Sequence, residues 1–272
     1  MALAAGAAFV PCGASAGGPD VVATALVAAP GATAGYCSTL NAFAYVDGLD
    51  GSIAPCALRP GAAIVDAVYL QNASRVGGTA LAAYPLVRLR AGLALRLQFT
   101  FDAPAAIAQS RPGGGGSFPV TSPGFGLTYT LAESPRGATA LSTNVFPPDG
   151  RFTPAHLQPR YALGLTNATA LSEKWTVGGT ASATSSQRTG SGMILPSLAA
   201  SAAYAPNART QFQAEIGTRI VTHRAVAQSF GDAAINQVLD KKLLFTVGVG
   251  TTFNAVNDAK PHYLASGFMY RP

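Results

Sequence analysis

From about residue 62 onward, bulky apolar side chains alternate with small or polar ones at a period of two. In residues 93–101 the odd positions carry Leu or Phe, and the even positions carry Ala, Arg, Gln and Thr. Residues 125–131 and 243–253 repeat the pattern, mainly with Phe, Leu, Tyr and Val against Gly and Thr. Because a strand places alternate side chains on opposite faces, the pattern predicts β-strands with one bulky apolar face.

About twelve such segments follow one another, and they approach the roughly 9–11 residues of a tilted membrane-spanning strand. The links between them alternate in length: residues 91–92 form a short link, and the stretch containing four glycines at 113–116 forms a long one. Short turns at one end and long loops at the other are typical of outer-membrane barrels. The medium length of link 254–261 leaves ten or fourteen strands open as alternatives. The segments are 63–71, 84–90, 93–101, 125–131, 138–145, 161–166, 174–181, 198–204, 210–220, 233–239, 243–253 and 262–270.

The composition separates this pattern from that of a soluble β-sandwich. The 272 residues are 49% hydrophobic and 11% charged, whereas soluble domains average about 25% charged residues. Opposite the bulky residues the strands carry mainly Gly, Ala, Thr and Ser, not the charges of a solvent-facing surface. The long uncharged runs 1–19 and 21–46 are mainly Ala, Gly, Ser and Thr and are interrupted by prolines, which argues against a transmembrane helix.

A closed barrel is the other structure whose backbone is satisfied inside a bilayer. We therefore predict an all-β fold: a transmembrane antiparallel up-and-down β-barrel of about twelve strands with a short irregular N-terminal extension. The predicted location is the bacterial outer membrane. With an even strand count, both ends of the barrel lie on the side of the short turns, which is periplasmic.

The N-terminal part has a different composition, with no Lys or Arg before Arg59. Residues 2–10 are apolar and precede Ala14-Ser15-Ala16, which is typical of the end of a secretory signal. We predict a signal-peptide remnant at 1–16, an N-terminal periplasmic extension at 17–60 and the barrel at 61–272. A flexible Ala/Gly tail is the alternative for the first segment.

Cysteines at 12, 37 and 56 bear on the extension. Removal of the signal would leave Cys37 and Cys56, the candidates for a disulfide that closes a loop of roughly 20 residues and stabilises by about 3 kcal/mol. Unpaired buried thiols are the alternative. The three histidines are scattered along the chain, so neither a metal site nor a cofactor is expected.

The phase of the alternation also predicts which polar residues face the inside of the barrel. One interpretation is a mildly cationic lining that selects or orients a solute. The other is a filled barrel in which these charges pair with one another, since a charge facing lipid at mid-depth costs about 2–4 kcal/mol. A lumen of about twelve strands is little wider than side chains can fill. The candidates for the lining are Asp66, Arg88, Arg90, Arg96, Gln98, Lys174, Gln213, Glu215 and Arg219.

Other classes of function find little support in the sequence. The net charge is +6, but Lys241-Lys242 is the longest basic run, so no nucleic-acid partner is predicted. The chain has no Gly-x-Ser-x-Gly, and the glycines at 113–116 are not followed by the Lys of a phosphate-binding loop. We predict that the protein is not an enzyme.

Aromatic residues lie near the ends of several segments and fit the girdles of a membrane barrel. Core packing is the alternative for them. They are Tyr161, Trp175, Tyr204, Tyr263 and Tyr270.

Three phrases of the sequence carry a resemblance to a known family: SFPVTSPGFGLTYTLAESPRG (117–137), LSEKWTVGGTASAT (171–184) and LLFTVGVGTTFNAVNDAKP (243–261). Together with the rest of 60–272, they resemble bacterial outer-membrane proteins named for a MetA pathway of phenol degradation. The resemblance implies a channel or transporter for small, aromatic or apolar solutes. Its partners would be outer-membrane lipid, lipopolysaccharide and the solute. A non-transporting structural or adhesive barrel is the alternative, and the oligomeric state stays open.

Overall fold

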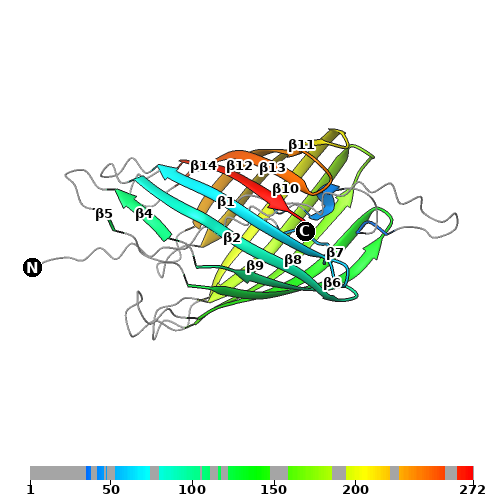
Figure 1. The fold of residues 1–272 in the computed structure, drawn as a ribbon, viewed down its shortest axis with the longest axis horizontal. Coiled ribbons are helices and arrows are strands. Elements are labelled where there is room, and N and C mark those ends of the chain that lie inside the picture. The colour runs from blue at the N-terminus through cyan, green and yellow to red at the C-terminus, as the bar shows by residue number, and fades with distance from the viewer. Residues whose placement is uncertain are drawn as a thin grey trace, which may run out of the picture.

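The computed structural model describes residues 35–37, 42–45, 47, 53–73, 80–104, 106–110, 116–117, 122–147, 159–185, 194–220, 227–254 and 262–271. These residues form one closed antiparallel β-barrel of 12 strands, shown in Figure 1. The fold class predicted from the alternation is therefore confirmed. Among the described residues, no helix is long and apolar enough to cross a membrane.

Neighbouring strands in the barrel are mostly neighbours in the sequence; the exceptions are β3 with β6, which β4 and β5 separate along the chain, and β1 with β14. The first strand closes the barrel by pairing with both the second and the last, for example Asp66 with Arg88 on one side and with Met269 on the other. Two further short strands, β4 and β5, extend the sheet beside β2 beyond the end of β3. The strands are β1 (Ala63–Ala73), β2 (Ala80–Ala94), β3 (Leu97–Asp102), β4 (Ala106–Ser110), β5 (Gly116–Ser117), β6 (Gly124–Ser134), β7 (Gly137–Phe146), β8 (Arg160–Ala170), β9 (Trp175–Ser185), β10 (Ile194–Asn207), β11 (Thr210–Ile220), β12 (Ala227–Val238), β13 (Leu243–Thr252) and β14 (His262–Tyr270).

The connections are short at one end of the barrel and longer at the other. The short ones are residues 95–96, 135–136, 171–174, 208–209 and 239–242. The start of β1 and the end of β14 lie at this same end, which we call the short-turn end. The alternation of connection lengths matches the prediction from the sequence, with one shift: the turn between β2 and β3 is at 95–96 and not at 91–92.

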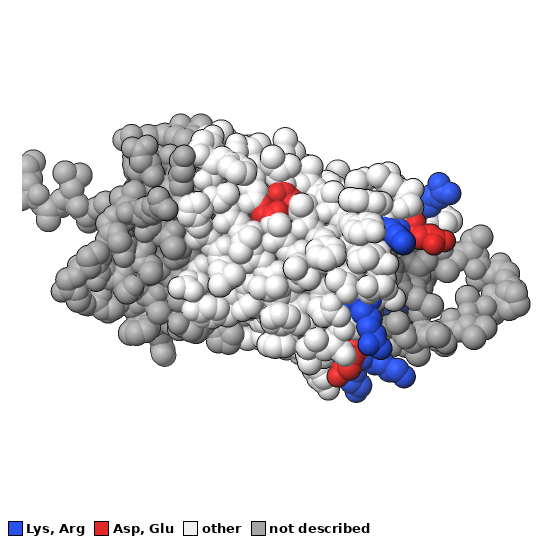
Figure 2. All heavy atoms as spheres, turned by 90° about the horizontal axis from the view of Figure 1, so that it is seen from above, with Lys and Arg blue, Asp and Glu red and all other residues white. Residues whose placement is uncertain are grey.

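The two faces of the wall differ as the alternation predicts. Along β6, for example, Phe125, Leu127 and Tyr129 point outward and are exposed, while Thr128 and Thr130 point inward and are buried. In Figure 2 the charged side chains gather at the short-turn end, and an acidic group interrupts the otherwise uncharged wall beside it. A barrel with an apolar outer belt and a polar interior is built to span a bilayer.

The described residues that precede β1 lie mostly against the inside of this wall. They include the short 3-10 helix η1 (Ala42–Tyr45). We call the described residues between 35 and 59 the plug. Of the predicted division of the chain, segment 1–16 lies outside the described residues, and the periplasmic location of 17–60 stays a prediction.

Candidate functional site

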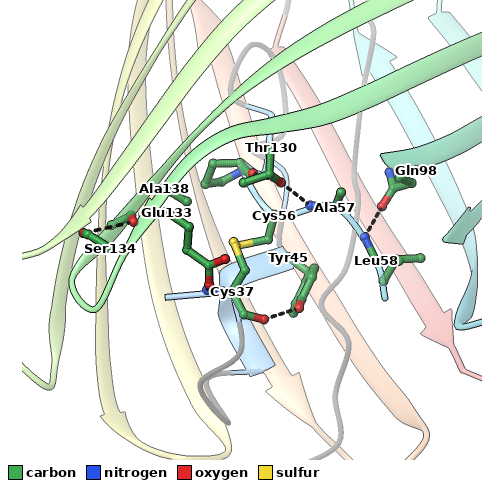
Figure 3. The surroundings of a disulfide bond; sticks show 12 residues. Cys37, Tyr45, Cys56, Ala57, Leu58, Gln98, Thr130, Glu133, Ser134 and Ala138 are labelled. Atoms are coloured by element: carbon green, nitrogen blue, oxygen red, sulfur yellow. Dashed lines mark hydrogen bonds between the residues drawn. A yellow bond between two sulfur atoms is a disulfide. The ribbon is translucent and has the colours of Figure 1, made fainter. Parts of the chain in front are cut away.

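The plug is bound to the barrel wall through hydrogen bonds between its backbone and inward-facing side chains. The Ala57 amide donates to Thr130 Oγ1 at 3.0 Å, and the Leu58 amide donates to Gln98 Oε1 at 3.2 Å (Figure 3). Two strands further along the wall, Thr166 Oγ1 of β8 donates to the carbonyl oxygen of Ile53 at 2.8 Å. Wall residues from β3, β6 and β8 therefore satisfy an irregular backbone that would otherwise be buried without partners.

An apolar cluster forms between the plug and the short-turn half of the wall. Leu58 is fully buried there, and so are Ile64 of β1 and Leu244 of β13. Burial raises the pKa of the Tyr36 hydroxyl above its ordinary value, opposed by a hydrogen bond with Thr176, so this plug residue packs as a neutral phenol. The main hydrophobic core of the described chain thus lies inside the barrel. Its buried members are Tyr36, Phe43, Ala44, Tyr45, Cys56, Leu58, Ile64, Ala138, Leu244 and Met269.

Cys37 and Cys56 are joined by a disulfide within the plug. The two cysteines are 19 residues apart in the sequence, and Cys56 is buried. Their surroundings connect the plug to the β6–β7 hairpin, because the Cys37 amide donates to Glu133 Oε1 at 2.8 Å and the Tyr36 amide to the Ser134 carbonyl oxygen at 2.7 Å. Figure 3 shows the disulfide beside Tyr45, whose hydroxyl donates to the carbonyl oxygen of Cys37.

A group of charged side chains lies where the plug meets β1, β2 and β3. Arg88 Nη1 lies 3.3 Å from Asp47 Oδ2, and Arg90 Nη1 lies 4.0 Å from the same oxygen. Arg90 Nε also lies 3.0 Å from Asp66 Oδ2, and Arg88 forms an ion pair with Asp102. We call these five residues the ion-pair cluster. Arg90 and Asp66 are almost completely buried, whereas the side chains of Arg88 and Asp102 are 21% and 22% exposed.

A second polar group lines the opposite wall. Asn236 is fully buried and donates to Gln211 Oε1 at 2.9 Å, and it accepts from Thr246 Oγ1 at 2.8 Å. The Tyr263 hydroxyl donates to Asp232 Oδ2 at 3.0 Å, so this ring points into the lumen rather than to the predicted outer girdle. The lumen wall is therefore polar around much of its circumference.

The predicted lining residues divide into two groups. Most lie on inward-facing strand positions: Asp66 and Arg90 are buried, and so are Gln98 and Glu215. Arg96 and Lys174 do not line the lumen, because they lie exposed in the turns 95–96 and 171–174. In those turns the period-two phase no longer applies. The residues on inward-facing positions are Asp66, Arg88, Arg90, Gln98, Gln213, Glu215 and Arg219.

The structure adds interior residues that the sequence did not single out. Asp102 continues the inward phase of Gln98 and Thr100 by one step past the predicted segment, so the alternation contained its signal. Asp232 and Arg160 belong to strand ends that the predicted segments omitted. Nothing in the sequence marked Asp47 as an interior residue, because the plug has no regular alternation of apolar and polar positions.

The space left between plug and wall is small on the side of β8–β11. A cavity of about 50 Å³ lies between Tyr36, Phe43 and Ile53 of the plug and the strand residues facing them. That volume holds a few water molecules. No group of three or more His, Cys, Asp or Glu within the described part of the chain could hold a metal ion.

Comparisons with known proteins agree with this architecture at the level of fold. The chain is similar in structure to the COG4313 outer membrane channel from Pseudomonas putida F1, with a TM-score of 0.62 and 16% identity over 79% of this chain and 97% of that chain. It is also similar to the NanC porin (TM-score 0.52, 7% identity, 75% of this chain and 98% of that one). The KdgM porin gives a TM-score of 0.50 and 9% identity over 75% and 98%. No family model and no curated protein sequence matches the chain.

These structural similarities identify the fold, but they do not identify a solute. The chain has the fold of outer-membrane channels and porins, built as a barrel with an apolar outer belt. Its resemblance to the family named for the MetA pathway stays a prediction, because no family model matches the chain.

Proposed function

We propose that the protein is an outer-membrane channel or transporter for small solutes, with the plug as the element that restricts its lumen. Three observations support this: the closed barrel, its apolar outer belt, and the likeness of its fold to outer-membrane channels. Outer-membrane lipid and lipopolysaccharide would surround the belt. A non-enzymatic role follows from the same proposal, and the resemblance in the sequence suggests aromatic or apolar solutes.

The main support for a channel is the polar interior of the barrel. Charged and amide side chains project inward at mid-strand, where an apolar filling would be simpler and more stabilising for a purely structural barrel. Arg88 lies opposite Asp66 on the neighbouring strand, Arg90 forms an ion pair with the same Asp66, and Glu215 lies opposite Asp232 in another strand pair. Ionisable residues at membrane depth are costly, and where they occur they commonly mark a path for ions or solutes.

The apolar cluster favours the alternative of a non-transporting barrel. Leu58 and its neighbours occupy the short-turn half of the lumen and resemble an ordinary protein core. In that case the plug would be a permanent filling, and the protein would be a structural or adhesive barrel. Most residues of the long loops that would carry adhesion lie outside the described residues.

Liposome swelling separates the two functions. Insertion is first verified by heat-modifiable gel migration, which a folded membrane barrel shows. Vesicles with inserted protein should then swell faster in small solutes of about the size of benzyl alcohol than protein-free vesicles do, and show little difference in larger sugars. Correct insertion without any acceleration for any solute would exclude the channel and favour the structural barrel.

A further inference from the structure

We propose that the ion-pair cluster is a subsite for a small carboxylate solute, and that Asp47 of the plug occupies this subsite in the structure described here. The inference rests on the proposed function, since it assigns a solute class to the proposed channel. It depends on three features of the cluster: the place of the Asp47 carboxylate, the support of the two arginines, and the charge balance.

The Asp47 carboxylate is held in the way that a bound carboxylate would be. Its Oδ1 accepts a hydrogen bond from the Ala54 amide of the plug at 2.6 Å. Its Oδ2 faces the wall and lies 3.3 Å from Arg88 Nη1 and 4.0 Å from Arg90 Nη1. The side chain is 5% exposed. One carboxylate oxygen is therefore bound by the backbone of the plug, and the other lies between two guanidinium groups of the wall.

The two arginines do not depend on Asp47 for their positions. Arg88 is paired through Nε and Nη2 with both oxygens of Asp102, the second at 3.3 Å. Arg90 is paired with Asp66 at 3.0 Å. These partners belong to β1 and β3, and Arg90 Nη1 also donates to the Tyr45 carbonyl oxygen of the plug at 3.2 Å, so contacts other than those with Asp47 orient both guanidinium groups. A site whose donors are already oriented binds a carboxylate at a lower entropic cost.

The ion-pair cluster itself has two positive and three negative charges, and a sixth residue, Arg160, adds a third positive charge near Asp102. Arg160 of β8 interacts electrostatically with Asp102, and its Cζ lies 4.2 Å from the centre of the Phe146 ring. Its Nε is buried and makes no hydrogen bond within the described part of the chain. Arg88, Arg90 and Arg160 contribute three positive charges, and Asp47, Asp66 and Asp102 contribute three negative ones.

Withdrawal of the plug carboxylate therefore leaves one net positive charge among these six groups, of which Arg90 and Asp66 are almost completely buried. An uncompensated buried charge is unfavourable, so an anion is drawn to the vacated position. The Phe146 ring lies near Asp102, the strand partner of Arg88: a Cβ on Gly124 would come within 2.7 Å of the ring and 3.0 Å of Asp102 Oδ2. An aromatic ring beside the carboxylate that orients Arg88 suits a solute whose carboxylate is attached to a small apolar or aromatic body.

Benzoate and benzamide test the site, because they have nearly the same shape and differ in charge. In Asp47→Asn protein folded in detergent, calorimetric titration should give about tenfold tighter binding of benzoate than of benzamide, as expected for charge-assisted hydrogen bonds. Asp240→Asn makes the same change of net charge in the exposed turn 239–242, and should show no preference. Adding Arg88→Gln to Asp47→Asn should remove the preference. Equal binding of the two compounds by folded Asp47→Asn would overturn the proposal.

A measurement on the native chain covers the case in which Asp47→Asn does not fold. Displacement of Asp47 by benzoate should loosen the plug, so dithiothreitol should reduce the Cys37–Cys56 disulfide several-fold faster in benzoate than in benzamide. Equal rates in the two compounds would contradict the proposal. Neither of these two assays depends on transport. Benzoate binding without liposome swelling would reject the channel and keep the subsite. Swelling without a preference for benzoate would keep the channel and reject the subsite.

Discussion

Arg96 combines an exposed side chain with a backbone conformation that suits glycine. Its φ is 68°, in the turn between β2 and β3. A residue with a Cβ loses about 1–2 kcal/mol in this left-handed region, and glycine does not. Arg96→Gly should therefore raise the free energy of unfolding by about 0.5–1 kcal/mol after the entropy of the added glycine is subtracted. Urea unfolding of the protein folded into lipid vesicles measures this.

Arg209→Gly is the matched control for that substitution. Arg209 is also an exposed arginine in a two-residue turn, between β10 and β11, and Arg96 is the only described non-glycine residue with a positive φ. Without strain to relieve, glycine at 209 should lower the free energy of unfolding by about 0.5–1 kcal/mol. Destabilisation by both substitutions would show that the backbone of Arg96 is not strained.

At the scale of single residues, the sequence predicts the side of the wall but not the neighbours. Tyr263 shows the difference. Its odd position in β14 matches that of the buried Ala265 and Met269, so the phase indicates an inward direction, although its place near a strand end suggested a girdle. The ring has room because Gly250 lies opposite on β13, where a Cβ would come within 2.1 Å of it. Only the register between the strands brings these two residues together.

At the scale of a strand, the cost of introducing a charge should differ between an outward-facing position and a turn. Leu127 points outward from the middle of β6 and is 44% exposed, whereas Leu95 in the turn 95–96 is 78% exposed. Leu127→Arg should destabilise the barrel in vesicles by about 2–4 kcal/mol, because a charge near mid-depth is removed from water. Leu95→Arg should cost less than about 1 kcal/mol. Both values come from urea unfolding, and equal costs would contradict the assignment of β6 as a membrane-spanning strand.

The strands themselves could be predicted because each one carries its own signal. All twelve expected segments correspond to strands of the closed barrel, with ends that differ by a few residues. The strands β4 and β5 were not expected, since they lie in a link rich in small residues and take their pairing from the projecting part of β2. The plug was not expected inside the lumen, because its backbone is held by distant wall residues such as Thr130 and not by a local pattern.

For the whole molecule, the disulfide is the constraint that keeps the plug compact. Cys37→Ser combined with Cys56→Ser should lower the free energy of unfolding by about 3 kcal/mol, because the unfolded chain regains the freedom of a loop closed over 19 residues. Urea unfolding under oxidising conditions measures the difference.

Dithiothreitol provides the control for this pair of substitutions. Reduction of the native chain should lower its stability by the same amount, and it should leave the double variant unchanged. If the double variant unfolds at the same urea concentration as the oxidised native chain, the disulfide does not constrain the unfolded state.

The pairing of β1 with β14 has a consequence for how the protein acquires its structure. The plug precedes β1, and the strand that closes the barrel against β1 is the last of the barrel, so the seam where Val65 pairs with Tyr270 joins segments from the two ends of the barrel sequence. The apolar cluster of the plug includes Ile64, Leu244 and Met269 from the strands on both sides of that seam. Closure of the barrel and burial of the plug therefore depend on the same contacts.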